Sequence, residues 1–241
     1  MTDHYIGGHI RRNLRLEDKS LSVPDLIIFD CDGVLVDSEV IALDTLREMM
    51  DSLGRPMTMA EADREFTGGS LADTIATAER LLGRPVLPDV GQSFGRRLFD
   101  RFRHELKPVP GVRDAILDLP YRRCVASSSS PDRLRLSLEV TGLAPLFEHV
   151  FSAVQVTRGK PAPDLYLLAA KTLGEPPDRC IVIEDTVRGV AAGRAAGARV
   201  VGFAGATHAT PALAEKLVRA GAEIVIGSMQ ELPAVVQRLV A

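Results

Sequence analysis

Short apolar runs recur along the chain, and each has the length of a strand that is buried on both faces. Most are separated by segments whose apolar residues recur with the spacing of an amphipathic helix. This alternation predicts βαβ units and a mostly parallel sheet covered by helices on both faces, which is the doubly wound α/β class. We expect strands at 26–30, 122–127, 149–153, 180–184, 199–203 and 223–227, and helices at 131–141, 163–173, 187–197, 209–220 and 229–240.

One interval breaks this alternation. Residues 40–107 contain apolar residues at helical spacing but no convincing strand. The stretch 107–111, Lys-Pro-Val-Pro-Gly, is stiff and suits a domain boundary. The pattern therefore predicts a helical domain at 40–107, inserted into a core made of 24–39 and 108–241, with a mobile N-terminal extension at 1–23.

Composition narrows the choice of partners. The chain has 241 residues, of which 46% are hydrophobic and 25% charged, and its formal net charge is −3. This balance offers no excess of positive charge to attract nucleic acid or anionic lipid. No apolar run approaches the roughly 18–20 residues that span a bilayer, so we expect a cytoplasmic protein. The three cysteines, Cys31, Cys124 and Cys180, lie in apolar runs and are interpreted as small buried side chains without a chemical role.

Polar residues that can do chemistry follow the predicted strands. In a doubly wound sheet, ligands bind beyond the carboxyl ends of the strands, near the point where the strand order reverses. The first strand ends in two aspartates and a glycine, the second in four serines, and the fourth in two carboxylates, while a lysine follows the third. The candidates are Asp30, Asp32, Gly33, Ser127, Ser128, Lys160, Glu184 and Asp185.

These residue types together indicate phosphoryl transfer. Several carboxylates at one point would repel one another unless a divalent cation lay between them, and ligation by oxygen alone suits Mg²⁺. A serine followed by the N–H groups of a helix start, together with a lysine, suits a phosphate group. Asp30 and Asp32 can face one substrate, so that one attacks phosphorus and the other transfers a proton. Gly33 permits a tight turn and close approach of the backbone.

A calcium-binding loop is the nearest alternative for the aspartate pair. Such a loop needs glycine at its sixth position and a bidentate glutamate at its twelfth. Counted from Asp30, Gly33 is fourth and Ile41 is twelfth, so the spacing excludes this interpretation.

The run Phe29-Asp30-Cys31-Asp32-Gly33-Val34-Leu35-Val36-Asp37-Ser38 resembles the first motif of the haloacid dehalogenase superfamily. Ser127 matches the second motif, Lys160 the third, and Glu184-Asp185-Thr186 with Gly189 the fourth, so the resemblance covers about residues 24–240. It implies a Rossmann-like core with a helical cap. It also implies that Asp30 is the nucleophile, Asp32 the acid and base, and Ser127 and Lys160 the phosphate-holding pair. Mg²⁺ would be bound by Asp30, the Asp32 carbonyl and Asp185, with Glu184 assisting.

Departures from the family motifs favour one activity within the superfamily. Asp32 argues against dehalogenases and phosphonate hydrolases, which lack an aspartate there. β-Phosphoglucomutases usually carry a histidine where Ala42 stands, and an arginine where Leu71 follows Gly68-Gly69-Ser70. We therefore expect a Mg²⁺-dependent phosphatase acting on a small sugar or sugar-acid phosphate. A phosphomutase and a non-catalytic protein that binds a phosphate ligand remain alternatives.

The residues that would select the substrate do not belong to any of these motifs. Arg64, Arg80, Arg84 and His104 lie in the predicted cap and are candidates to contact the non-phosphate end of the substrate, although solvated surface positions are the commoner explanation. His208 is interpreted as a loop residue. The expected partner is a small phosphate ester, with the chain acting as a monomer or homodimer.

Overall fold

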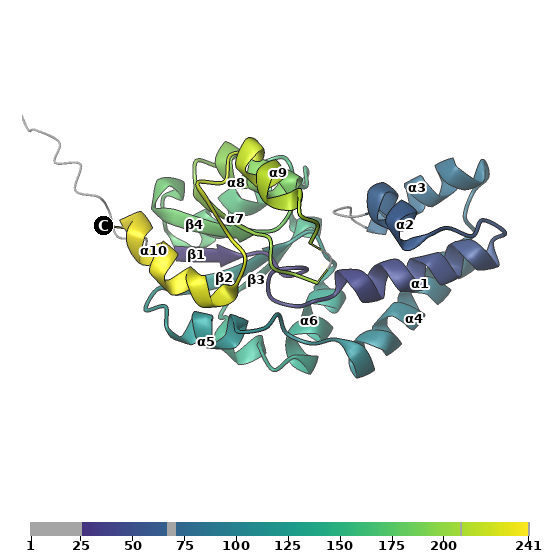
Figure 1. The fold of residues 1–241 in the computed structure, drawn as a ribbon, viewed down its shortest axis with the longest axis horizontal. Coiled ribbons are helices and arrows are strands. Elements are labelled where there is room, and N and C mark those ends of the chain that lie inside the picture. Colours follow the sequence, from purple (N-terminus) through teal and green to yellow (C-terminus); the bar gives the residue numbers. More distant parts are fainter. Residues whose placement is uncertain (1–25, 67–70, 208, 241) are drawn as a thin grey trace, which may run out of the picture.

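Six parallel strands form one sheet in the computed structural model, which describes residues 26–66, 71–207 and 209–240. The order is β3-β2-β1-β4-β5-β6, so the chain starts at the centre, moves outward on one side and then on the other (Figure 1). This confirms the doubly wound, Rossmann-like class. The strands are β1 (Leu26–Phe29), β2 (Arg122–Ser127), β3 (Val150–Ser152), β4 (Cys180–Glu184), β5 (Arg199–Phe203) and β6 (Ile224–Ile226).

The central strand β1 shows why the apolar runs form a sheet of this kind. All four of its side chains are at most 1% exposed. Ile27 and Phe29 belong to one apolar cluster, whereas Leu26 and Ile28 belong to the other. Successive side chains of a strand point to opposite faces, so an uninterrupted apolar run is what a strand covered on both faces requires.

Six helices pack on the sheet and are divided between its two faces; the sheet and these six helices are called the sheet lobe. Side chains of α5 (Val112–Leu117), α6 (Pro131–Val140) and α10 (Leu232–Val240) pack in the cluster with Phe29. Those of α7 (Asp164–Leu173), α8 (Val187–Ala195) and α9 (Leu213–Ala220) pack in the cluster with Ile28. Figure 1 shows the two groups on opposite sides of the sheet. Short 3₁₀ turns lie at Ala144–Leu146, Ala153–Gln155, Pro177–Arg179 and Met229–Glu231.

The expected elements agree with this arrangement apart from their ends. Two helices begin later than the pattern predicts, α9 at Leu213 and α10 at Leu232, because a turn and a 3₁₀ segment precede them. Helix α5 was not predicted, since its six residues are too few to show a helical period.

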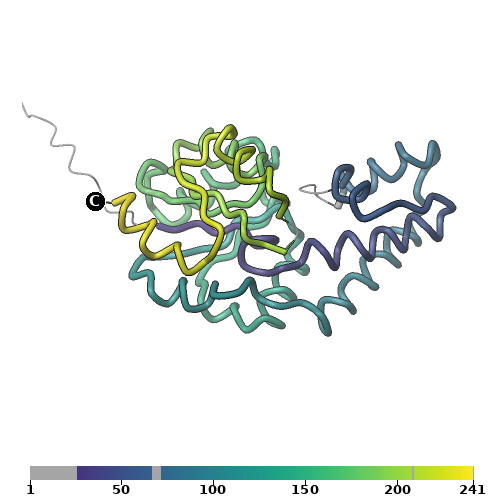
Figure 2. Tube along the Cα trace, in the orientation of Figure 1, coloured from purple at the N-terminus to yellow at the C-terminus, as the bar shows by residue number. Residues whose placement is uncertain are grey.

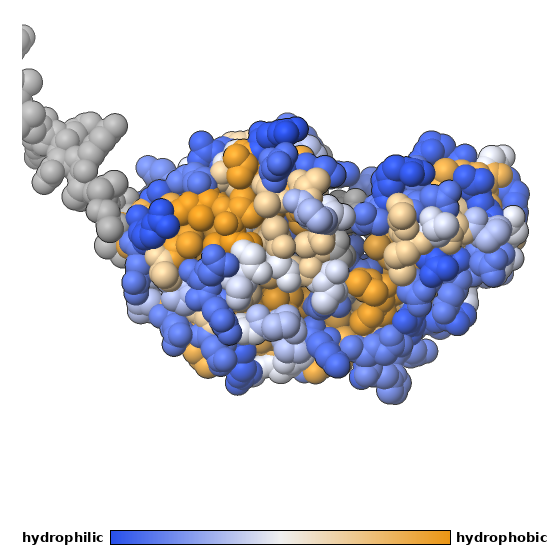
Figure 3. All heavy atoms as spheres, viewed as in Figure 1, coloured by the Kyte–Doolittle hydropathy of each residue, from blue (hydrophilic) through white to orange (hydrophobic). Residues whose placement is uncertain are grey.

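Between β1 and α5, the described residues form four helices, which we call the helical lobe: α1 (Glu39–Ser52), α2 (Met59–Phe66), α3 (Leu71–Leu82) and α4 (Pro88–Glu105). The lobe lies beside the sheet lobe, with α1 and α4 running together away from the junction (Figures 1 and 2). Figure 3 shows hydrophilic side chains over much of its outer surface, and apolar ones where the two lobes meet and near α10. No helix in the described residues is long and apolar enough to cross a membrane.

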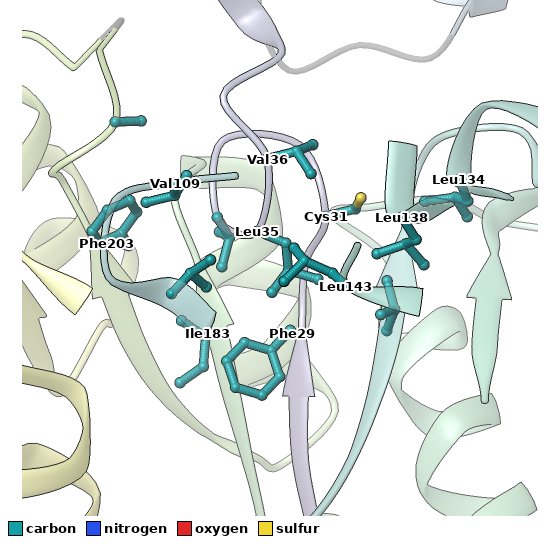
Figure 4. Close-up of a cluster of buried hydrophobic side chains, with 14 of the residues drawn as sticks. Phe29, Cys31, Leu35, Val36, Val109, Leu134, Leu138, Leu143, Ile183 and Phe203 are labelled. Carbon is teal, nitrogen blue, oxygen red and sulfur yellow. The ribbon is translucent and has the colours of Figure 1, made fainter. Parts of the chain in front are cut away.

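The two chain segments that join the lobes are hydrogen-bonded to each other. The Asp37 N–H donates to the Lys107 carbonyl, and the Val109 N–H donates to the Leu35 carbonyl, both at 3.0 Å. Figure 4 shows Leu35, Val36 and Val109 in the apolar cluster next to Phe29. The same cluster holds Cys31, which is fully buried. The other two cysteines are buried as well, which confirms their interpretation as packing residues. The junction is therefore anchored in the core beside the end of β1.

Candidate active site

Six of the sequence-predicted residues line one cavity of about 50 Å³ at the carboxyl edge of the sheet. The cavity lies where the strand order reverses between β1 and β4. Asp30 directly follows β1, and its N–H donates to the Ile183 carbonyl at 3.0 Å, which continues the ladder by one residue. The six are Asp30, Asp32, Ser127, Ser128, Lys160 and Glu184.

Gly33 and Asp185 have different positions from these six. Gly33 does not line the cavity. Its φ of 78° lies in the left-handed region that favours glycine, and its N–H donates to the Val36 carbonyl at 2.8 Å. The turn that it makes brings the chain back from Asp32 toward the helical lobe. Asp185 is 2% exposed and lies in the acidic group described below.

Lys160 is buried and connects three parts of the site. Its Nζ lies 2.6 Å from Oδ1 of Asp30, 2.7 Å from Oε1 of Glu184 and 3.1 Å from the Ala126 carbonyl oxygen. Burial alone would lower the pKa of Lys160, but the carboxylates of Asp30 and Glu184 raise it well above its usual value. Lys160 is therefore a permanent cation in the cavity wall.

Three buried carboxylates could hold a metal ion beside Lys160. Oxygen atoms of Asp30, Glu184 and Asp185 all lie within 4.8 Å of one another. Burial raises the pKa of Asp30 well above its usual value; Lys160 opposes this shift, while the negative charges of Glu184, Asp185 and Asp32 add to it. The donor set contains oxygen only, and one lysine does not balance three carboxylates. These residues thus fit a hard divalent cation such as Mg²⁺.

Both carboxylate oxygens of Glu184 accept hydrogen bonds from neighbouring side chains. Its Oε1 accepts from Lys160 and from the Tyr166 hydroxyl, both at 2.7 Å. Its Oε2 accepts from the N–H and hydroxyl of Thr186 at 3.1 and 2.9 Å. Although burial raises the pKa of Glu184, these partners lower it below its usual value. The residue orients Lys160 as well as contributing negative charge.

Asp32 lines the same cavity but has different hydrogen-bond partners. Its Oδ1 accepts from the Ser38 hydroxyl at 2.6 Å and from Arg133 at 2.7 Å, and its Oδ2 accepts from the Ser129 hydroxyl at 2.5 Å. Burial raises the pKa of Asp32, but the Arg133 charge and the two hydroxyls outweigh it and lower the pKa below its usual value. The side chain is fixed as an oriented carboxylate.

The serine run after β2 is ordered by its own hydrogen bonds. Ser127 is buried, and its Oγ accepts from the Ser129 N–H at 3.1 Å. Ser130 is the N-cap of α6 and accepts from the Arg133 N–H at 3.4 Å. The run is thus a strand-to-helix connection that directs hydroxyl groups into the cavity.

Sequence reasoning missed Arg133, Tyr166 and the roles of Ser38 and Ser129. Arg133 and Tyr166 lie in the first turns of α6 and α7, directly after polar chain segments at the sheet edge. Cα–Cβ bonds of a helix tilt toward its N-terminus, so side chains of a first turn reach back over the strand ends. Polar residues at those positions were the available signal.

The four cap candidates do not line this cavity. Arg64 and Arg80 both pair with Glu65 on the surface of the helical lobe, at 3.3 and 2.8 Å. Arg84 donates to the Leu53 carbonyl at 3.2 Å, and Nδ1 of His104 lies 2.7 Å from the Asp100 carbonyl oxygen. His208 and the Gly68-Gly69-Ser70 stretch lie outside the described residues.

A model of the haloacid dehalogenase-like hydrolases matches residues 24–197, and the chain belongs to this family. It is 31% identical to a phosphorylated carbohydrates phosphatase of Thermotoga maritima, over 72% of this chain and 82% of that protein. It is 30% identical to a bifunctional riboflavin kinase/FMN phosphatase of Arabidopsis thaliana over 73% of its length, but spans only 47% of that enzyme. A solved haloacid dehalogenase-like protein of unknown function from Agrobacterium tumefaciens superimposes with a TM-score of 0.79 at 40% identity, covering 90% of this chain and 99% of that one.

Proposed function

We propose that this protein is a Mg²⁺-dependent phosphatase that hydrolyses a small sugar or sugar-acid phosphate through an aspartyl-phosphate intermediate. The observation that carries the proposal is the position of two differently held carboxylates on one cavity. Asp30 contacts a buried lysine within a group of acidic residues, whereas Asp32 accepts hydrogen bonds from three other residues. The name of the Thermotoga relative supports a phosphorylated carbohydrate as the substrate class.

The reaction is divided between the two aspartates. An oxygen of the Asp30 carboxylate attacks phosphorus and the bond from phosphorus to the leaving oxygen breaks. Asp32, in the form that has taken up a proton from solvent, gives this proton to the leaving oxygen. In the second half, water attacks the aspartyl phosphate and gives its proton to Asp32, so that inorganic phosphate leaves and Asp30 is restored. Each aspartate ends in the state in which it began.

The remaining site residues would bind the phosphoryl group and the metal ion. Lys160, with the hydroxyl and N–H groups of Ser127 and Ser128, is suited to bind the phosphoryl oxygens, whose charge must be neutralised during transfer. Asp30, the Asp32 carbonyl and Asp185 would hold Mg²⁺, with Glu184 assisting. When bound, the cation supplies positive charge that lowers the pKa of Asp30 and draws electron density from the phosphoryl group.

We also assign the helical insertion at 40–107 the role of a cap that covers the site, next to a core of residues 24–39 and 108–241. An ion pair joins the two parts near the cavity, since Nη1 of Arg188 lies 3.9 Å from Oδ2 of Asp73 in α3. Closure would exclude water during transfer of the phosphoryl group. A phosphomutase is less well supported, because it needs a second cationic site for the other phosphate of its substrate.

The experiment is phosphate release from a panel of sugar phosphates and sugar-acid phosphates, with Mg²⁺ and with EDTA. Asp30→Asn should abolish release, whereas Asp132→Asn should not, because the Asp132 side chain is 75% exposed in α6. Isomerisation of a sugar phosphate without phosphate release would replace the proposal with a phosphomutase. Tight binding without turnover would replace it with a binding protein.

A further inference from the structure

A second, larger cavity adjoins the catalytic one at the junction of the lobes. It has a volume of about 170 Å³. Glu39, Ser128, Ser129 and Arg133 line both cavities, so the two are continuous. Whatever leaving group is attached to a phosphate in the catalytic cavity would extend past these four residues into the second one.

The side chains that line this second cavity change from polar to mostly apolar with distance from the catalytic cavity. Polar groups lie at the shared boundary. Beyond it, most of the lining side chains are aliphatic or aromatic and come from two helices of the helical lobe: Ala42, Leu43 and Leu46 of α1, and Phe94, Leu98 and Phe99 of α4. Phe66 of α2 and Thr74 of α3 complete this part of the lining.

Charge is scarce in this part of the site. Among the described residues that line the second cavity, Arg133 is the one cation, and its guanidinium is bonded to Asp32 and lies over the Phe102 ring at 5.1 Å. A carboxylate or second phosphate deep in the cavity would therefore lose its water without gaining a counter-ion, which is costly. An apolar group placed there would instead gain from its transfer out of water.

The volume sets the size of such a group. An apolar protein cavity of about 150 Å³ holds one benzene molecule. The 170 Å³ available here therefore suits one six-membered ring or an alkyl branch of similar size, but not a fused three-ring system.

We infer that the preferred substrate is a phosphate monoester whose leaving group is polar near the ester oxygen and ends in an apolar part about one ring in size. This rests on the proposed phosphatase function and specifies its substrate: a sugar or polyol phosphate that carries an aromatic or alkyl substituent is favoured over the bare sugar phosphate. The specificity is provided by the facing sides of α1 and α4.

The test compares kcat/KM for ethyl phosphate and 2-phenylethyl phosphate with Mg²⁺. Both are esters of primary alcohols, so their leaving oxygens have similar basicity and the ring is the main difference. Burial of an aromatic ring predicts a preference of about 10-fold to 100-fold for the phenylethyl ester. Phenyl β-glucoside 6-phosphate should likewise exceed glucose 6-phosphate, because it adds the ring beyond a polar spacer.

A substitution that fills the cavity should remove this preference. Gly95 of α4 lines the second cavity, and a Cβ built there meets no atom within 4 Å. Gly95→Leu should therefore fold, since leucine favours the helix, while the ratio of the two kcat/KM values falls toward one. Gly91→Ala is the matched control: Gly91 lies one turn earlier, does not line the cavity, and its Cβ would make an ordinary contact with Ile75 at 3.6 Å.

The outcomes separate this inference from the proposed function. If 4-nitrophenyl phosphate is hydrolysed but the wild-type ratio is near one, or if Gly95→Leu leaves a high ratio unchanged, the inference is wrong and the phosphatase stands. If neither 4-nitrophenyl phosphate, nor the alkyl esters, nor any sugar phosphate or sugar-acid phosphate of the panel is hydrolysed, both are wrong.

Discussion

Two aspartates separated by one residue occupy opposite electrostatic settings. Asp30 lies among carboxylates with one lysine, and Asp32 is surrounded by donors, including the Arg133 guanidinium. Burial, with the negative charges of the neighbouring carboxylates, raises the pKa of Asp30. Burial also acts to raise the pKa of Asp32, but the Arg133 charge and the hydroxyl donors outweigh it and lower that pKa. Their spacing in the sequence places both aspartates on one side of the chain. The cation that contacts each of them is distant in the sequence: Arg133 lies 101 positions from Asp32, and Lys160 lies 130 positions from Asp30.

Replacing Arg133 should change the pH dependence of the reaction through Asp32. Arg133 favours the ionised form of Asp32, so Arg133→Gln should raise the pKa of Asp32. The step in which Asp32 donates a proton should then persist to higher pH, and the alkaline limb of the kcat/KM profile should move upward. The measurement is that profile for one phosphate ester in both proteins.

Arg135→Gln provides the control for this shift. Arg135 is in the same helix, pairs with exposed Asp132 at 3.3 Å, and does not contact Asp32. An alkaline limb that stays in place in Arg133→Gln, or that moves equally in Arg135→Gln, would show that Arg133 does not act through Asp32.

At the scale of the element, helix α8 positions the end of β4. The Thr186 hydroxyl caps the helix by accepting from the Gly189 N–H at 3.0 Å. A Cβ on Gly189 would overlap the carboxyl group of Glu184. The absence of a side chain thus lets the first turn of α8 lie against the residue that orients Lys160.

Gly189→Ala should impair catalysis more than stability. The methyl group must push the Glu184 carboxyl away from Lys160 and Tyr166, and small displacements of positioning groups can cost about 100-fold in rate. We expect kcat/KM to fall 10-fold to 100-fold, while the free energy of unfolding falls by only about 1–3 kcal/mol. Steady-state kinetics and urea unfolding measure the two effects. Equal kcat/KM in Gly189→Ala and in the helical control Gly91→Ala would refute this.

For the whole molecule, the site is assembled where chain segments far apart in the sequence meet. The connections at 30–38 and 106–111 are tied together by hydrogen bonds, and they set the helical lobe beside the sheet edge. The buried carboxylates repel one another in the folded protein, whereas the unfolded chain holds them apart in water. A cation that binds only the folded form should therefore stabilise the molecule.

Mg²⁺ should raise the melting temperature even without substrate. At 100 times its dissociation constant, a ligand of the folded state adds about 2.7 kcal/mol, which corresponds to roughly 5–10 °C for a chain of this size. Differential scanning calorimetry with Mg²⁺ and with EDTA measures the shift. Asp185→Asn should reduce it and Asp132→Asn should not; an identical shift in both variants would place the cation elsewhere.

Sequence patterns were sufficient to predict the sheet and the residues that gather at its carboxyl edge. Strands buried on both faces require uninterrupted apolar runs, and parallel strands bring their carboxyl ends to one edge, so Asp30, Ser127 and Glu184 could be placed together without coordinates. Three features could be seen in the folded structure alone: Arg133 pairs with Asp32, the Tyr166 hydroxyl donates to Glu184, and α1 and α4 line the second cavity with apolar side chains. These contacts depend on how the helices pack against the strand ends and against each other. A helical period or a polar residue in a first turn does not specify that packing.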